Sequence, residues 1–166
     1  WRTFVRNHIH QSVAVDFAVV PTIKFSLLYV FVVLDHERRR ILHINVTANP
    51  TAEWTAQQVV EALPWETDVR FLFRDGDGIY GEEFKRRVTG LGLQQVVSAR
   101  ASPWQNAYCE RVIGTLRREC LDHVVAVNER QLKRVIDDFV RDYNASRTHV
   151  SLAKNSPAGR LPSSKK

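Results

Sequence analysis

Three apolar runs near the start of the chain limit most strongly what it can fold into. They lie at 13–20 (VAVDFAVV), 27–34 (LLYVFVVL) and 40–47 (RILHINVT). Runs of this length that are rich in Val and Ile are typical of buried strands. The connection at 35–39 is short and charged, as in a β-hairpin. Three successive strands predict an antiparallel meander, so we expect a sheet at the centre of the fold.

Strand and helix signals alternate after the meander, which favours parallel strands added to the same sheet. The expected elements are a helix from 51 to 64, a strand at 69–73, a helix at 84–91, a strand at 93–97 and two long helices opening at Ser102 and Asn128. Ser102 is the expected N-cap of the first long helix, with Pro103 and Gln105 as further start signals. We predict an α/β fold with a five-stranded mixed sheet flanked by helices.

The chain has 166 residues, which suits one domain of roughly 100–200 residues. We expect a lead-in at 1–12, a core at 13–153 and a tail at 154–166. No apolar run approaches the ~20 residues that cross a bilayer, so no membrane partner is expected. Because Trp1 is not a natural start and Met is absent, we expect a piece of a longer protein.

The formal charge is +6 and the sequence pI is about 9.7. An excess of Lys and Arg favours a polyanionic partner, because these side chains displace counterions from nucleic-acid backbones. A surface that only keeps the protein in solution is the alternative.

The two cysteines, Cys109 and Cys120, are 120 − 109 = 11 positions apart. On one helix they would be separated by about 16 Å along the axis. A disulfide requires Cα atoms within about 7 Å, so we expect both to stay reduced, as in a cytosolic protein.

Acidic residues stand at three notable places. Asp16 interrupts a run that otherwise has the character of a buried strand, where a charge is costly unless it is paired or metal-bound. Asp75 and Asp77 follow a strand in a glycine-rich turn, and Glu110 lies on the polar face of a predicted helix. Taken singly, each has an ordinary explanation: a bulge or an arginine partner for Asp16, turn chemistry for Asp75 and Asp77, and a solvated charge for Glu110.

Taken together, two strand-borne aspartates and one helix-borne glutamate can converge on a pair of divalent cations about 3.5–4 Å apart. Hard oxygen ligands with few histidines suit Mg²⁺ or Mn²⁺ rather than Zn²⁺. Such a pair would activate water or a 3′-hydroxyl and stabilise the leaving oxygen of a displacement at phosphorus. The expected metal ligands and catalytic residues are Asp16, Asp75 and Glu110.

Three segments resemble the catalytic blocks of the retroviral integrase superfamily, whose signature is Asp-Asp-Glu. They are the strand that carries Asp16, the segment 74–84 (RDGDGIYGEEF), and the segment 102–119 (SPWQNAYCERVIGTLRRE). The spacing of 110 − 75 = 35 positions between Asp75 and Glu110 also agrees with that signature.

Within the superfamily, the block from Tyr143 to His149 and Leu152 resembles the end of bacterial insertion-sequence transposase cores. The resemblance covers roughly residues 12–160.

The resemblance implies an RNase H-like fold and metal-dependent cleavage and strand transfer of DNA in transposition or integration. It implies transposon ends and target DNA as partners, a homodimer or higher oligomer, and action in the bacterial cytoplasm at the nucleoid. Asp16 and Asp75 would hold the first metal, and Glu110 with Asp16 the second. Relatives have glycine where this chain has Asp77, which leaves open whether Asp77 shares the role of Asp75.

Basic residues near the acidic ones are candidate DNA contacts that position the duplex without reading its sequence. Asn106, one turn before Glu110, is a further candidate or else an ordinary surface amide. For 38–40 (RRR) we prefer a solvated hairpin tip. The candidate DNA-binding residues are Lys85, Arg100, Asn106, Arg111, Arg117 and Arg118.

Two other functions fit the same residues. An RNase H-like nuclease would cut without joining, and a non-catalytic relative would only bind DNA. The glutamate on a helix and the block at 144–149 favour the transposase over the nuclease. The presence of all three carboxylates argues against a non-catalytic descendant.

Overall fold

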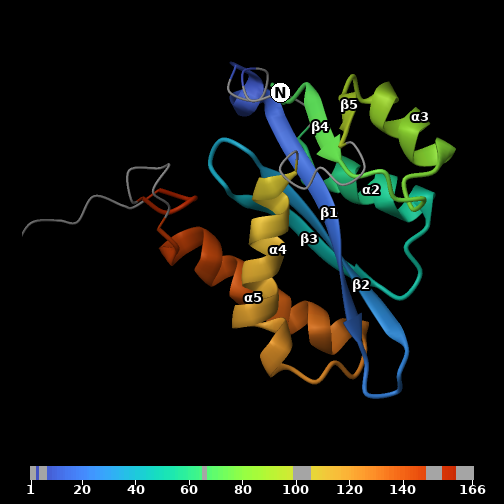
Figure 1. Cartoon of the computed structure of the whole chain (residues 1–166), viewed down its shortest axis with the longest axis vertical. Coiled ribbons are helices and arrows are strands. Elements are labelled where there is room, and N and C mark those ends of the chain that lie inside the picture. Colours follow the sequence, from blue (N-terminus) through green and yellow to red (C-terminus); the bar gives the residue numbers. More distant parts are fainter. Residues whose placement is uncertain (1–2, 4–6, 65–66, 99–105, 149–154, 160–166) are drawn as a thin grey trace, which may run out of the picture.

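The computed structural model describes residues 3, 7–64, 67–98, 106–148 and 155–159. Figure 1 shows the strands side by side with helices on both sides. The elements are η1 (Ile9–Gln11), β1 (Ser12–Pro21), β2 (Leu27–Asp35), β3 (Ile41–Thr47), α2 (Ala52–Ala62), β4 (Phe71–Arg74), α3 (Glu82–Gly90), β5 (Gln94–Val97), α4 (Ala107–Glu119), η3 (Leu121–His123) and α5 (Glu129–Ser146).

The sheet has five strands in the order β3-β2-β1-β4-β5, with β1 at its centre. β1 pairs with β2, and β2 with β3, in antiparallel register. β4 runs parallel to β1, and β5 runs parallel to β4. The predicted antiparallel meander with parallel additions, and with it the five-stranded mixed sheet flanked by helices, is confirmed.

Each face of the sheet has its own apolar core. Alternate residues of β1 point to opposite faces, as the pleat requires. On one face Ala14 and Ala18 pack with apolar residues of α4 and α5. On the other face Val13 and Val15 pack with residues of α2 and α3. The molecule therefore has three layers, and β1 is buried from both sides (Figure 1).

Two helices begin at the predicted residues. Thr51 caps α2 by accepting a hydrogen bond from the Trp54 backbone N–H at 3.2 Å. Asn128 caps α5 in the same way, accepting from the Gln131 N–H at 2.9 Å. These side chains satisfy N–H groups that have no partner inside the helix.

The start of α4 differs from the expectation. The helix begins at Ala107 with Asn106 at its N-cap, four positions after Ser102, and Asn106 makes no capping hydrogen bond with its side chain. Ser102, Pro103 and Gln105 lie outside the described residues. Glu110 consequently belongs to the first turn of α4, where a carboxylate faces the positive end of the helix dipole.

Arg39 corrects the expectation of a solvated tip at 38–40. Arg38 and Arg40 are exposed, but the Arg39 side chain is buried. Its guanidinium lies 3.1 Å from the centroid of the Tyr108 ring, and its Nη1 donates to the His36 carbonyl at 2.6 Å. The backbone of Arg39 is left-handed (φ 58°), and Tyr108 of α4 offers the flat surface on which a guanidinium stacks.

Asn144 connects α5 to the edge strand β3. Its Oδ1 accepts from the Ile41 N–H and its Nδ2 donates to the Ile41 carbonyl, both at 3.0 Å. The backbone of Asn144 also accepts from the Ala158 N–H at 2.9 Å. Asn144, which belongs to the block 143–149, therefore has a structural role in holding α5 against β3.

None of the helices in the described part of the chain has the length and apolar character that crossing a bilayer requires.

His36 is the buried ring beneath Arg39. It lies between the rings of Phe73 and Tyr108, with centroids 4.8 Å and 5.6 Å away. Burial, and next the positive charge of Arg39, lower the pKa of His36 from 6.5 to about 3. The folded state thus keeps this ring neutral at pH values where the unfolded chain would protonate it.

Replacing His36 with Phe should therefore remove part of the acid sensitivity of the fold. Because the folded pKa is lowered, the contribution of His36 to stability is complete above pH 6.5 and is lost as pH falls toward 3. The slope is about 1.4 kcal/mol per pH unit. Urea unfolding of both proteins at about pH 7.5 and about pH 5.5 should show their difference in unfolding free energy changing by roughly 1.4 kcal/mol. A difference that stays constant would contradict a neutral, buried ring.

Candidate active site

Three elements bring the predicted carboxylates to one region of the molecule. Asp16 lies in the middle of β1, opposite Val32 of β2. Asp75 directly follows β4, the strand that runs parallel to β1 on its other side. Glu110 lies in the first turn of α4, which packs across β1 and β2. Each carboxylate thus comes from a different element, and β1 lies between the other two.

The charges of these residues act on one another. Burial first, and then the negative charges of Asp75, Glu110 and Asp77, raise the pKa of Asp16 from 3.8 to about 7, against a lowering effect of the Phe17 N–H. That N–H donates to Asp16 Oδ1 at 2.8 Å. Burial and the charge of Asp75 raise the pKa of Glu110 as well. Like charges thus raise the pKa of both Asp16 and Glu110, and the charge of Asp75 contributes to each.

Asp75 and Asp77 form consecutive turns after β4. Asp75 Oδ1 accepts from the Asp77 N–H at 3.2 Å, and Asp77 Oδ1 accepts from the Ile79 N–H at 2.9 Å. Asp75 is half-buried and Asp77 is exposed. Of the two, Asp75 has the larger effect on the pKa of Asp16 and is the one that acts on Glu110. The electrostatics therefore favour Asp75 as the partner of both other carboxylates.

Sequence reasoning missed two buried groups around these carboxylates. Tyr80 and Cys109 are buried, and burial followed by the charge of Asp16 raises the pKa of each well above its ordinary value. Within the described residues the Tyr80 hydroxyl has no hydrogen-bond partner. An aromatic residue in a glycine-rich turn and a cysteine on a core stripe give no functional signal before the fold is known.

Arg74 precedes Asp75 and is buried despite its charge. Its Nε donates to Gln95 Oε1 at 3.0 Å and its Nη1 to the Asp75 carbonyl at 2.8 Å. Its guanidinium also lies 5.1 Å from the centroid of the Tyr80 ring. Arg74 thus holds the turn that carries Asp75 against β5, and its charge also interacts with that of Asp75.

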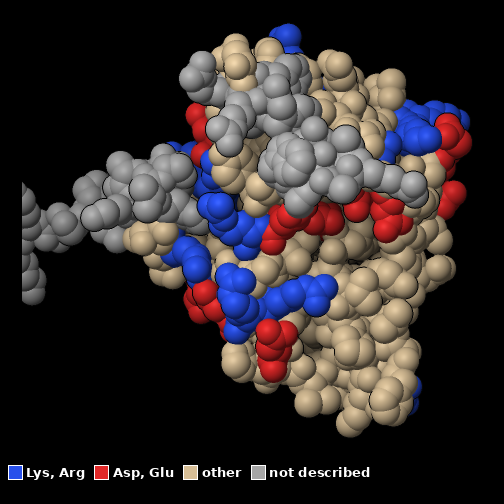
Figure 2. Space-filling model, viewed as in Figure 1, with Lys and Arg blue, Asp and Glu red and all other residues tan. Residues whose placement is uncertain are grey.

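The candidate DNA-binding residues have different surroundings. Arg111, Arg117 and Arg118 are exposed along α4, and Lys85 of α3 pairs with Glu82 at 2.5 Å. Asn106 is buried, with 3% of its surface exposed. Arg100 lies outside the described residues. Figure 2 shows acidic side chains in a band across one face of the molecule, with basic side chains on either side of it.

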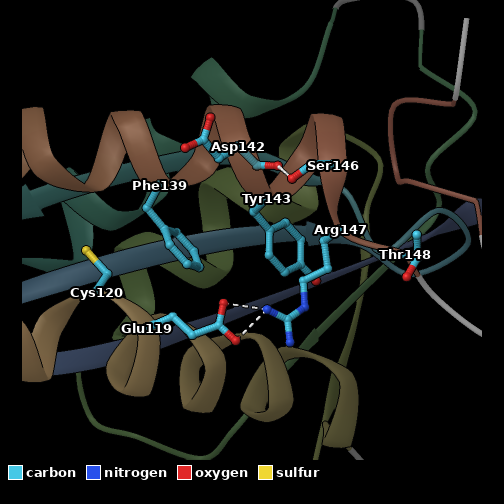
Figure 3. A pocket seen from close by; sticks show the side chains of 8 residues that line it. All are labelled: Glu119, Cys120, Phe139, Asp142, Tyr143, Ser146, Arg147 and Thr148. Atoms are coloured by element: carbon cyan, nitrogen blue, oxygen red, sulfur yellow. Dashed lines mark hydrogen bonds and ion pairs between the residues drawn. The ribbon is translucent and has the colours of Figure 1, made fainter.

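A pocket of about 560 Å³ lies between the C-terminal ends of α4 and α5 (Figure 3). Arg147 Nη1 donates to both carboxylate oxygens of Glu119 across this pocket. Glu119 is nine positions beyond Glu110, about 14 Å along the helix axis. The pocket is therefore remote from the three carboxylates, and its ion pair ties α4 to α5.

The donor chemistry of the three carboxylates fits a hard divalent cation, because their mutual repulsion would be relieved by positive charge. Across residues 7–64, 67–98, 106–148 and 155–159, however, no group of three or more His, Cys, Asp or Glu side chains is gathered closely enough to hold a metal ion. Binding of a cation would therefore have to draw the three carboxylates closer together.

Sequence comparison connects the chain to mobile DNA elements. The integrase core domain family matches residues 91–157. An uncharacterized 39.2 kDa protein of insertion element IS476 from Xanthomonas euvesicatoria is 36% identical over 67 residues. That match covers 40% of this chain and 19% of the relative, so the chain corresponds to a fraction of the relative's length.

Solved structures give the same result for the fold. The intasome of simian T-cell lymphotropic virus in complex with a PP2A regulatory subunit contains a chain with a TM-score of 0.70 at 14% identity, over 94% of this chain and 58% of that one. The HTLV-2 integrase catalytic core domain in complex with magnesium has a TM-score of 0.68 at 12% identity, over 90% and 94%. The fold is that of an integrase catalytic core. The predicted resemblance to the integrase superfamily, with its RNase H-like fold, is confirmed.

A third integrase core shows how far the likeness extends. The catalytic core domain of BIV integrase has a TM-score of 0.59 at 14% identity, over 90% of this chain and 91% of that one. The family match includes Glu110 and the arginines of α4, but it begins after Asp16 and Asp75. The family match therefore does not extend to the two aspartates.

Replacing Asp16 with Asn should stabilise the metal-free protein at about pH 8. Because burial and repulsion raise the pKa of Asp16 to about 7, its charge disfavours folding above that pH, and the effect fades as pH falls toward 3.8. We expect a gain in unfolding free energy on the order of 2 kcal/mol. Urea unfolding in EDTA measures it, with Asp138→Asn on the exposed face of α5 as a control that changes by less than about 0.5 kcal/mol. Equally small changes in unfolding free energy in Asp16→Asn and Asp138→Asn would contradict an unfavourable charge on Asp16.

Proposed function

We propose that this chain is the catalytic core of a transposase that cuts and joins DNA strands through Asp16, Asp75 and Glu110. The observation that supports it most is the electrostatic coupling of these three carboxylates within an integrase-like fold. The family match and the insertion-element relative point to the same process, the movement of DNA segments.

The proposed cofactor is a pair of Mg²⁺ or Mn²⁺ ions, held by the three carboxylates. When bound, the ions supply charge for the phosphorus centre and lower the pKa of a coordinated nucleophile. Magnesium is named in the HTLV-2 integrase core structure, which shares this fold. In this chain, Asp16 is central because its side chain responds to the charges of both Asp75 and Glu110.

The reaction is a displacement at phosphorus in two rounds. In the first, an oxygen of water forms a bond to phosphorus, the bond to the DNA 3′-oxygen breaks, and that oxygen leaves with a proton as a free 3′-hydroxyl. In the second, the 3′-hydroxyl gives up its proton, bonds to a phosphorus of the target strand, and displaces a new 3′-hydroxyl. Neither round needs an external energy source, because hydrolysis of a phosphodiester is favourable in water and joining exchanges one phosphodiester for another.

The proposed partners are transposon-end DNA and target DNA. The arginines of α4, Arg111, Arg117 and Arg118, are exposed on the helix that carries Glu110 and can contact phosphates beside it. Relatives of this fold are described as an intasome and as a trimeric form, which supports self-association here. Given the bacterial relative, we propose that the protein acts in the cytoplasm, where the chromosome lies.

Two other activities remain as outcomes of the test. A nuclease that only hydrolyses DNA would use the same carboxylates, and a non-catalytic relative would bind DNA without a metal. A branched oligonucleotide with one labelled strand separates all three. Joining gives a longer labelled strand, hydrolysis gives a shorter one, and binding alone leaves the length unchanged.

We expect strand joining with Mn²⁺ in the unmodified protein, and at least about a thousandfold loss in each of Asp16→Asn, Asp75→Asn and Glu110→Gln. These changes keep side-chain size and remove only the charge that a cation needs. Asp77→Asn should keep activity within about tenfold, because Asp77 is exposed and couples less strongly to Asp16. Thermal unfolding of each variant shows that the fold persists.

Full activity in any one of the three variants would overturn the assignment of that residue. If Asp77→Asn lost activity and Asp75→Asn kept it, Asp77 rather than Asp75 would be the metal ligand. Shorter products without longer ones would identify a nuclease.

A further inference from the structure

Asn106 joins two of the elements that carry the carboxylates. Its side-chain Nδ2 donates to the backbone carbonyl of Val15 at 3.3 Å. Its own carbonyl accepts from the Glu110 N–H at 3.2 Å, which is the first hydrogen bond of the α4 helix ladder. One residue is therefore bonded to the neighbour of Asp16 on one side and to Glu110 on the other.

The position of Val15 explains why an amide is needed there. The register between β1 and β4 ends at the pair Ala14 and Phe73, so Val15 is the first residue of β1 beyond that ladder. β4 itself ends at Arg74, where the chain turns away at Asp75. Asn106 supplies a donor to β1 at the level where β4 no longer does so.

The Asn106 side chain is buried, so its polar atoms need hydrogen-bond partners inside the protein. Asn106 is 3% exposed, and within the described residues its Oδ1 has no hydrogen-bond partner. A buried polar atom without a partner is unfavourable, so an apolar residue would serve better if Asn106 only filled space. The side chain also makes no capping bond to its own helix, the usual role of Asn at this position.

We propose that Asn106 is a positioning residue that fixes the first turn of α4 against β1 and so sets Glu110 relative to Asp16. It acts through the Val15 carbonyl and the Glu110 N–H, not by touching DNA. The part concerning metal binding rests on the proposed function, whereas the fixing of α4 can be tested without it.

The test compares three single substitutions in the full chain. Asn106→Ala removes the amide. Asn106→Leu keeps the number of side-chain heavy atoms but has no donor. Gln58→Ala is the matched control, because Gln58 is also a buried amide, accepting from His43 and Asn45 on the opposite face of the sheet. It should lower the melting temperature as Asn106→Ala does, without touching α4.

Amide hydrogen exchange is the first readout. We expect exchange at 110–113, the first amides that are hydrogen-bonded within α4, to become about five- to tenfold faster in both Asn106 variants, while 116–119 and the control stay unchanged. The Leu variant should show this even where its melting temperature matches the parent. Unchanged exchange at 110–113, or equal acceleration in Gln58→Ala, would overturn the proposal.

Mn²⁺ affinity, measured by calorimetry, is the second readout. We expect it to be about tenfold weaker in the Asn106 variants and unaltered in Gln58→Ala. Parental affinity in the Asn106 variants would show that Asn106 does not set the carboxylate spacing. If the parent protein neither binds Mn²⁺ nor joins DNA, the proposed function fails, and the exchange readout still decides whether Asn106 fixes α4.

Discussion

The structure depends on keeping a carboxylate in the middle of a strand that packs against an apolar core on each face. β1 is covered on both faces and Asp16 pairs with Val32 of β2, so Asp16 loses hydration that an exposed aspartate keeps, and its pKa rises to about 7. Apolar residues in the strand next to Asp16 offset part of this cost by packing with two separate cores. The charges of Asp75 and Glu110 add electrostatic repulsion to this cost. Several carboxylates that raise one another's pKa are expected at a site that binds cations.

Much of the fold could be predicted because its signals are local. β-Branched runs marked β1, β2 and β3, and the side chains of Thr51 and Asn128 fixed where two helices begin. The start of α4 could not be predicted in this way, because Asn106 bonds to Val15, which is 91 positions earlier in the chain. The prediction of a solvated Arg39 was wrong for the same reason. Its burial depends on Tyr108, which no local sequence pattern connects to it.

The candidate site shows the same division. Asp16 could be singled out because a charge in an apolar run is unusual, and Asp75 and Glu110 because their spacing matched a known signature. The side chains around them, Tyr80 and Cys109, carry no such mark, since their role comes from where the fold places them. Sequence patterns thus identify groups that are chemically conspicuous, and the three-dimensional arrangement is needed for those that shape their environment.

The distribution of the carboxylates along the chain also bears on how the protein is made. Asp16 and Asp75 belong to the part of the chain that is synthesised first, and Glu110 belongs to a later helix that packs against β1. A growing or prematurely ended chain therefore has two of the three acidic groups and lacks the helix that completes the set. On the proposed function, a chain that ends before α4 would lack Glu110 and with it one of the three proposed metal ligands.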